Sequence, residues 1–265
     1  MTSLPLYQVD AFADKVFAGN PAAVVPLDAW LPDATLQAIA MENNLAETAY
    51  FIPANSPDAD FQLRWFTPSV EVDLCGHATL ASAHVLFEHR GFTNKAVRFM
   101  TKSGVLTVTK TTDSLAMELP ARPGNPFMHD DAVSRALGAT PRLLLKARDL
   151  MAVFADAQTV RALTPDMTAL MKLPHFAVIA TAPGDDGLDF VCRFFAPSQG
   201  IPEDPVTGSA FSTLAPYWAG RLKKSTLRAR QVSKRGGNVT VIYDGGDTVT
   251  LNGAAVTYLA GKIYL

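Results

Sequence analysis

The alternation of apolar and polar residues divides the first part of the chain into short strands and two helices. Strand-like runs cover residues 6–11, 61–66, 96–101, 104–109 and 114–119, and helical spacing covers residues 33–43 and 77–89. Asp33, which follows Pro32, is suited to cap the first of these helices. The three closely spaced runs after residue 95 predict an antiparallel sheet joined by tight turns.

A segment rich in proline and glycine, PARPGNP at residues 120–126, separates this part from the rest. It predicts two halves, residues 1–121 and 122–265, with a last strand that could return to the first half. The second half is again mixed, with helical spacing at residues 132–137 and 164–171 and strand-like runs at 150–155, 176–180 and 190–195. Because strands and helices do not alternate regularly, the pattern indicates an α+β fold.

The chain also contains an internal repeat. The segment LRWFTPSVEVDLCGHATLASAHVL, which starts at Leu63, is answered by CRFFAPSQGIPEDPVTGSAFSTLAPYW, which starts at Cys192. The matching residues are Arg64, Phe66, Pro68 and Ser69 in the first copy and Arg193, Phe195, Pro197 and Ser198 in the second. Each copy has the pattern of a strand, a loop and a helix with few charges. This predicts two related halves, each with a central, buried helix.

A glycine stands at the start of each repeated helix, Gly76 in the first copy and Gly208 in the second. Glycine lets a ligand approach the backbone closely, and the first N–H groups of a helix attract an anion. Taken singly, each glycine could merely permit a turn. As a pair, they favour a carboxylate site between the two halves.

Composition limits the classes of partner. The 265 residues are 48% hydrophobic and 18% charged, with a formal net charge of −2. This balance gives no electrostatic reason to expect nucleic acid or a membrane, so a small molecule is the expected partner. Two cysteines and the absence of an apolar leader predict a cytoplasmic protein. Seven of the 23 basic residues fall in residues 221–235, where they could attract an anion or simply face solvent.

Four segments, FAGNPAAVV, LAETAYF, VDLCGHATLAS and EDPVTGSAFS, resemble the hallmark segments of the PhzF-like family, which includes the phenazine-biosynthesis isomerase. The resemblance covers nearly the whole chain and places it in the diaminopimelate-epimerase-like superfamily. It implies two pseudo-symmetric halves, each a curved, mostly antiparallel sheet around a central helix, with the active site between them. It also implies a homodimer that works without a metal or organic cofactor.

The resemblance further implies an isomerase that shifts a proton within a small, cyclic hydroxy or amino carboxylic acid. Its acid/base glutamate corresponds to Glu47. The other catalytic positions fall on His77 and Asp204, and the substrate-binding positions fall on Asn20, Gly76, Gly208 and Ser209. The segment ARQVSKRGG departs from the phenazine enzyme's glycine-containing form, which leaves the native substrate open.

The residues themselves leave alternatives beside these roles. Glu47 leads into an apolar stretch, which suits a proton shuttle, but it could also be an exposed glutamate at the start of a strand. His77, with a neutral ring near pH 7, could exchange a proton or simply cap the helix. Asp204 could hold a polar substrate group or orient His77, yet aspartate before proline is also a common turn residue.

Cys75 supports a second hypothesis, an epimerase, racemase or dehydratase that uses its thiol as a base. A two-thiol racemase needs a facing cysteine, but the repeat places Thr207 at the position equivalent to Cys75. A third hypothesis is a protein that binds a small carboxylate without catalysis. A metal site is not expected, because His77 and His84 are separated by roughly 10 Å along a helix.

Overall fold

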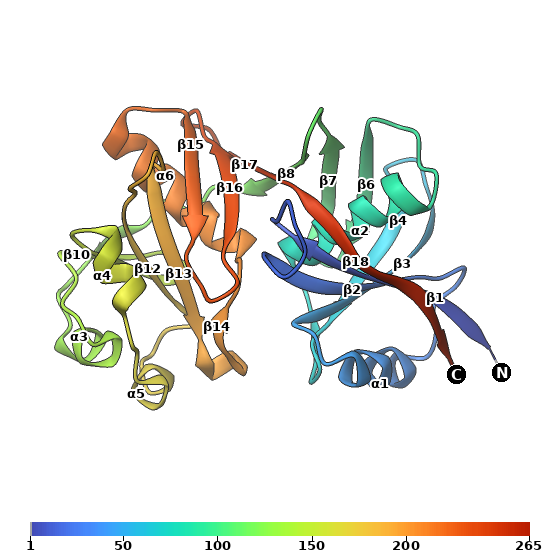
Figure 1. The fold of residues 1–265 in the computed structure, drawn as a ribbon, viewed down its shortest axis with the longest axis horizontal. Helices are drawn as coiled ribbons and strands as arrows, with labels where there is room; N and C mark the ends of the chain where they lie inside the picture. The colour runs from blue at the N-terminus through green and yellow to red at the C-terminus, as the bar shows by residue number, and fades with distance from the viewer. Residues whose placement is uncertain (1) are drawn as a thin grey trace. The chain divides into compact units, whose positions relative to one another are not determined.

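The computed structural model describes residues 2–265, which form two compact units. The first unit consists of the chain up to Glu118 together with Asn252–Leu265, and the second unit is Leu119–Leu251. The chain passes from the first unit to the second between Glu118 and Leu119, and the predicted boundary is at residue 121. The last strand belongs to the first unit, where it lies beside the N-terminal strand (Figure 1).

The first unit is built from strands that surround one long helix. Its elements are β1 (Ser3–Ala11), β2 (Asn20–Pro26), α1 (Asp33–Asn43), β3 (Glu47–Ser56), β4 (Ala59–Phe66), β5 (Glu71–Val72), α2 (Gly76–His89), β6 (Ala96–Thr101), β7 (Gly104–Lys110), the start of β8 (Leu115–Pro120) and β18 (Ala255–Tyr264). β3 is parallel to β2, β4 is antiparallel to β3, β6 is parallel to β4, and β7 is antiparallel to β6. β1 pairs with both β2 and β18 in antiparallel fashion.

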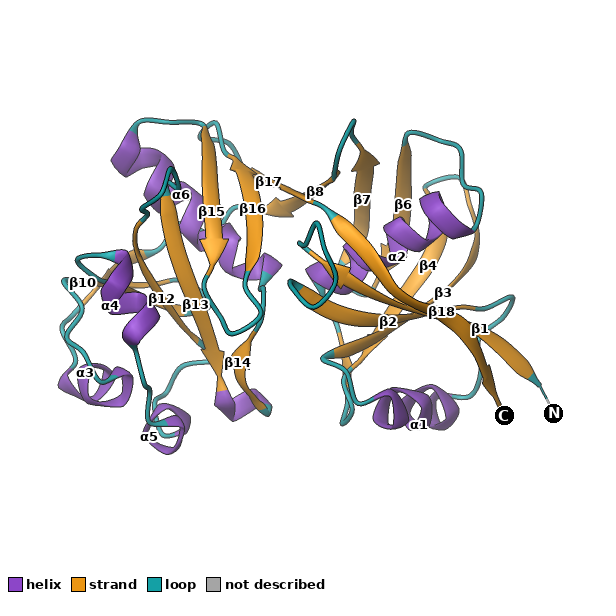
Figure 2. Cartoon of the chain, in the orientation of Figure 1, coloured by secondary structure: helices purple, strands orange, loops and turns teal. Residues whose placement is uncertain are grey.

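Helix α2 forms the centre of the first unit. It packs against β1, β2, β3, β7 and β18, and Figure 2 shows it among these strands. Its side chains are small or apolar, and Leu80, Ala81 and Val85 are fully buried. A helix with so little charge is stable only when strands cover it on most sides. The predicted central helix of the first half is therefore confirmed.

The second unit repeats this construction around another buried helix. Its elements are β9 (Asn125–Phe127), α3 (Asp131–Leu137), β10 (Leu143–Lys146), β11 (Leu150–Val153), α4 (Ala157–Ala162), α5 (Met167–Met171), β12 (Val178–Pro183), β13 (Phe190–Ala196), η1 (Pro197–Gln199), β14 (Ile201–Asp204), η2 (Gly208–Ala210), α6 (Phe211–Leu222), β15 (Thr226–Gln231), β16 (Gly237–Ile242) and most of β17 (Thr248–Gly253). α6 buries Phe211, Leu214 and Trp218 completely.

The order of strand pairing is the same in the two units. β12 is parallel to β11, β13 is antiparallel to β12, β15 is parallel to β13, and β16 is antiparallel to β15. This is the sequence of pairings that β2, β3, β4, β6 and β7 make in the first unit. The predicted α+β fold is thus observed, and the two units share one order of strand pairing.

The repeat extends to individual contacts. Arg64 Nε donates to Glu71 Oε1 over 2.7 Å, and its equivalent Arg193 donates in the same way to Glu203 over 2.7 Å. The two guanidinium carbons lie 5.1 Å and 4.9 Å from the ring centres of Phe66 and Phe195. A fork of this kind joins the two strands that precede each central helix. Glu203 therefore has a structural role.

Some element boundaries differ from the predictions. Asp33 is the first residue of α1 and not its cap, a position that Pro32 occupies, and its carboxylate accepts from Arg64 over 2.9 Å. The helix predicted over residues 164–171 begins only at Met167, because the side chain of Asp166 caps it by accepting from the N–H of Ala169. Among residues 2–265, none of the helices is long and apolar enough to cross a membrane.

Candidate functional site

Glu47 lies at the start of β3, directly after the loop that follows α1. Asn44 ends α1 in the left-handed conformation (φ 49°), and its N–H donates to the carbonyl of Ala40. The chain then enters β3, where Glu47 pairs with Ala22 of β2. Glu47 is only 8% exposed, so the alternative of an ordinary exposed glutamate is wrong.

His77 is the second residue of α2, and its ring is fixed from both sides. Its Nε2 lies 3.0 Å from Oε2 of Glu47, and its Nδ1 lies 3.2 Å from Nδ2 of Asn20, the first residue of β2. His77 is 4% exposed and Asn20 is fully buried. Three residues predicted for the site therefore meet, although 57 residues separate Asn20 from His77.

These contacts determine how the imidazole is oriented. An amide nitrogen can only donate, so Asn20 holds Nδ1 of His77 as an acceptor and leaves the ring proton on Nε2. Nε2 lies 3.0 Å from Oε2 of Glu47, the nearest negative group. At this separation a proton can pass between the ring and the carboxylate, while Asn20 holds the ring in place.

The surroundings of His77 change its acidity. Burial lowers the pKa of its ring, but the contact with Cys75 and the charge of Glu47 raise it by more, so the pKa lies well above its ordinary value. The carboxylate beside the ring favours its protonated form, whereas the amide nitrogen of Asn20 at Nδ1 favours the neutral one. The neutral ring near pH 7 therefore stays a prediction.

Cys75 is the residue just before α2, and its Sγ lies 3.5 Å from Nδ1 of His77. Burial, and secondly the charge of Glu47, raise the pKa of the Cys75 thiol. A thiol in such surroundings stays protonated and is a poor base. The geometry therefore gives Cys75 a hydrogen-bonding contact to the histidine.

Glu47, Cys75 and His77 are also the one group of described residues that could hold a metal ion. Each offers one ligand atom, and the three atoms lie within 4.8 Å of one another. A metal would have to displace the proton of the buried Cys75 thiol and break the contact between His77 and Glu47.

The start of α2 supplies backbone donors beside this cluster. Gly76 is the first residue of the helix, so its N–H and that of His77 have no partner within the helix. Helix α2 is 14 residues long and carries no acidic residue in its first turn. The positive end of its dipole is therefore not offset locally, which suits a carboxylate ligand.

Of the residues predicted in the second unit, Asp204 belongs to a buried cluster just before α6, together with Thr207 and Gln231. Thr207 donates from Oγ1 to Oδ2 of Asp204 over 2.5 Å. Gln231, at the end of β15, accepts the N–H of Thr207 over 2.9 Å and donates to the carbonyl of Asp204 over 2.6 Å. Gln231 is fully buried and Asp204 is 8% exposed. One glutamine side chain thus fixes the loop that carries Asp204 and leads to Gly208.

Ser209 follows Gly208 in η2, and an arginine that sequence reasoning missed contacts it. Arg148 donates from Nη2 to Oγ of Ser209 over 3.0 Å and makes two hydrogen bonds to the buried carboxylate of Asp149. The segment KARDLM around Arg148 has no motif that would have revealed this contact. Arg148 brings a fixed positive charge next to a residue predicted to bind substrate.

Comparison with known proteins agrees with this geometry. The family model for the PhzC-PhzF family, described as phenazine biosynthesis-like protein, matches residues 9–261. A protein from Pseudomonas aeruginosa named an uncharacterized isomerase is 49% identical, with 99% of each chain covered. The crystal structure of a PhzF-family phenazine biosynthesis protein from Enterococcus faecalis is 44% identical, with a TM-score of 0.95 and 100% of each chain covered.

A more distant match shows the fold alone. A hydroxyproline epimerase from Agrobacterium vitis is 12% identical, with a TM-score of 0.65, and the match covers 98% of this chain and 92% of that one. It places the chain among proteins with an epimerase-like fold. The full-length relatives named isomerases identify the chain as an isomerase. From its match to the family model over residues 9–261, the chain belongs to the PhzC-PhzF family of phenazine biosynthesis-like proteins.

Proposed function

We propose that the chain moves a proton between two carbon atoms of a small, cyclic hydroxy or amino carboxylic acid, without a cofactor, and that Glu47 carries the proton. One observation supports this above the others. Glu47 is a buried carboxylate whose Oε2 lies 3.0 Å from Nε2 of a histidine that Asn20 holds in place. General acid/base catalysis needs such a positioned group in a site with little water.

The proposed reaction has two steps. Glu47 first takes a proton from a substrate carbon, and the electron pair left on that carbon is delocalised into the adjacent unsaturated system. The protonated Glu47 then returns the proton to a second carbon of the same molecule, so the enzyme ends as it began. His77 assists by hydrogen bonding to the carboxylate while it is charged.

One base can serve both carbons only if the substrate is held in one orientation. We assign this task to the start of α2, where the N–H of Gly76 and the side chain of Asn20 would bind the substrate carboxylate. The residues Asp204, Gly208 and Ser209 of the second unit stay predictions as further substrate contacts. Their support is the family resemblance and the rigid loop that Gln231 holds.

The test is exchange of substrate hydrogen with solvent deuterium. Cyclic hydroxy and amino acids are first screened by thermal shift, and those that stabilise the protein are incubated with it in D₂O and followed by proton NMR. Glu47→Gln keeps the size of the side chain and its acceptor oxygen for His77, so the variant should fold and bind normally. It should exchange slower by a factor of about 10² to 10⁴.

The matched control is Glu42→Gln, which makes the same change on the exposed face of α1. It should exchange at the wild-type rate. Undiminished exchange in Glu47→Gln would remove Glu47 from the mechanism. Ligands that stabilise the protein but never exchange would favour the binding protein without catalysis. A loss of exchange in Cys75→Ala, with Glu47→Gln unaffected, would favour the thiol-dependent epimerase or dehydratase. The homodimer and the cytoplasmic location stay predictions.

A further inference from the structure

Two arginines lie on an exposed face of the second unit. Arg228 and Arg230 are two positions apart on β15, so their side chains leave the same face of the sheet. Opposite them on β16 lie Thr240 and Asn238, in register with Arg228 and Arg230 respectively. This face therefore alternates guanidinium groups with an amide and a hydroxyl.

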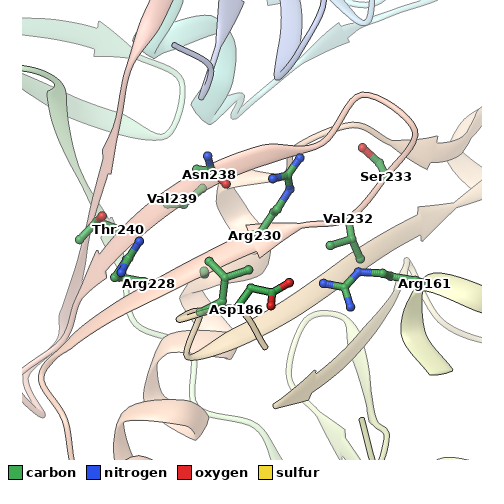
Figure 3. Close-up of a pocket in the computed structure, with 11 residues that line it drawn as sticks. Arg161, Asp186, Arg228, Arg230, Val232, Ser233, Asn238, Val239 and Thr240 are labelled. Carbon is green, nitrogen blue, oxygen red and sulfur yellow. The ribbon is translucent and has the colours of Figure 1, made fainter. Parts of the chain in front are cut away.

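These residues line a pocket of about 740 Å³, within the size range of small-molecule sites. Figure 3 shows Arg228 and Arg230 on one strand and Arg161 entering from the opposite side. Among residues 2–265, no hydrogen-bond partner is seen for either guanidinium of β15. By contrast, Arg161 is occupied, because its two terminal nitrogens donate to Asp185 over 2.6 Å and 2.7 Å.

The two guanidinium groups of β15 are packed against glycine turns. A methyl group on Gly236 (φ 66°) would lie 3.1 Å from Nη2 of Arg230, and one on Gly187 (φ 80°) would lie 3.7 Å from Nη1 of Arg228. The left-handed backbone at both turns favours glycine, and at Gly236 the missing side chain leaves room for the guanidinium group of Arg230.

The charges indicate the class of ligand. Arg161 is offset by Asp185, and Arg228 lies near Asp189, whose carboxylate accepts its backbone N–H and also pairs with Lys224. The lining of the pocket carries Arg228, Arg230 and one carboxylate, Asp186, which faces Arg161 in Figure 3. Guanidinium groups bind phosphate through paired hydrogen bonds. A carboxylate at the other end of a pocket accepts hydrogen bonds from hydroxyl groups. The net charge of −2 for the whole chain gives no reason to expect a nucleic acid.

We propose that this arginine pocket, defined by Arg161, Asp186, Arg228, Arg230, Asn238 and Thr240, binds a small phosphate ester that carries hydroxyl groups. The phosphate lies between Arg228 and Arg230, where Asn238 and Thr240 can also donate to it. A hydroxyl of the ester donates to Asp186. The proposal does not depend on the proton transfer assigned to Glu47, since every residue of the pocket belongs to the second unit.

The experiment is isothermal titration calorimetry on the full chain at constant ionic strength, with glucose 6-phosphate as the probe. Saturable binding is expected for glucose 6-phosphate, weaker binding for inorganic phosphate, and none for glucose. Arg228→Gln and Arg230→Gln should each weaken binding by about tenfold or more, since each removes charged hydrogen bonds. Asp186→Asn should weaken the binding of glucose 6-phosphate and leave the binding of inorganic phosphate unchanged.

Arg135→Gln is the matched control, because Arg135 is exposed on α3, outside the pocket. It should bind like the wild type, as should Glu47→Gln. The proposal would be overturned if glucose 6-phosphate showed no saturable binding. It would also be overturned if Arg228→Gln and Arg230→Gln bound glucose 6-phosphate as tightly as the wild type. Citrate bound as tightly as glucose 6-phosphate would overturn the assignment to phosphate. A failure of Glu47→Gln in the deuterium assay has no bearing on these titrations, so the two proposals fail separately.

Discussion

Gln231 offers a sharp test of how the loop before α6 is held. Its side chain is fully buried and makes four hydrogen bonds, with the N–H of Thr207 (2.9 Å), the carbonyl of Asp204 (2.6 Å), Oγ1 of Thr207 (3.2 Å) and Sγ of Cys192 (3.9 Å). Gln231→Leu keeps most of the side-chain volume and removes all four. The substitution therefore isolates the polar contribution of the glutamine.

The magnitude follows from which groups lose their partner. The hydroxyl of Thr207 still donates to Asp204, so it stays satisfied. The N–H of Thr207 and the carbonyl of Asp204 are left buried without the side chain that served them. Each such group costs roughly 1 to 3 kcal/mol, and a total loss of about 3 kcal/mol in the free energy of unfolding is expected.

The assay is urea unfolding followed by circular dichroism. Gln158→Leu is the control, because Gln158 is exposed on α4 in the same unit, and it should change stability by no more than about 0.5 kcal/mol. If Gln231→Leu also stays within about 0.5 kcal/mol of the wild type, the hydrogen bonds of Gln231 do not hold the loop. A changed slope with urea would instead mean a change in the surface exposed on unfolding.

Three further predictions concern single side chains. Burial lowers the pKa of His84 to about 4, below the unfolded value of about 6.5, so the free energy of unfolding should be highest above pH 6.5 and fall towards pH 4. His84→Gln should remove about 3 kcal/mol of that fall, measured by urea unfolding at both pH values. An equal fall in the variant would contradict this. Arg148→Met should lower the free energy of unfolding by about 2 kcal/mol, because it leaves the Asp149 carboxylate unpaired. Arg148→Lys should recover only part of that loss, since lysine cannot make both hydrogen bonds of the guanidinium group. Full recovery by lysine would show that the bidentate geometry is unimportant. Iodoacetamide should modify Cys75 far more slowly in the native protein than in urea, because burial raises the pKa of the thiol. Mass spectrometry measures the two rates, and equal rates would show a reactive thiolate.

Much of the fold could be read from the sequence because its signals are local. The strands at residues 96–101 and 104–109 and the helix at residues 77–89 were predicted within one residue of their observed ends, since side-chain alternation and helical spacing act over a few residues. The weaker predictions concern irregular segments. The helix around Thr164 begins later than its apolar spacing suggests, because an aspartate cap, and not hydrophobicity, determines its first turn.

The repeat is the clearest property that the sequence by itself determined. Arg64 and Arg193 occupy equivalent places, and the structure shows each bound to a glutamate and lying over a phenylalanine. Residues that match in order along a strand, a loop and a helix form the same local contacts, because those contacts depend on neighbours close in the chain. The two buried central helices follow for the same reason.

Only the tertiary structure decided which polar groups meet. Asn20, Glu47 and His77 converge because the parallel pairing of β2 with β3 and the packing of α2 against both strands bring three distant segments together. The contacts of Gln231 with Thr207 and of Arg148 with Ser209 likewise join residues 24 and 61 positions apart. No periodicity in the sequence encodes such contacts, since they depend on strand register and on packing between elements. The direction of the shift in the pKa of His77 was also decided there, because it depends on a carboxylate 3.0 Å away.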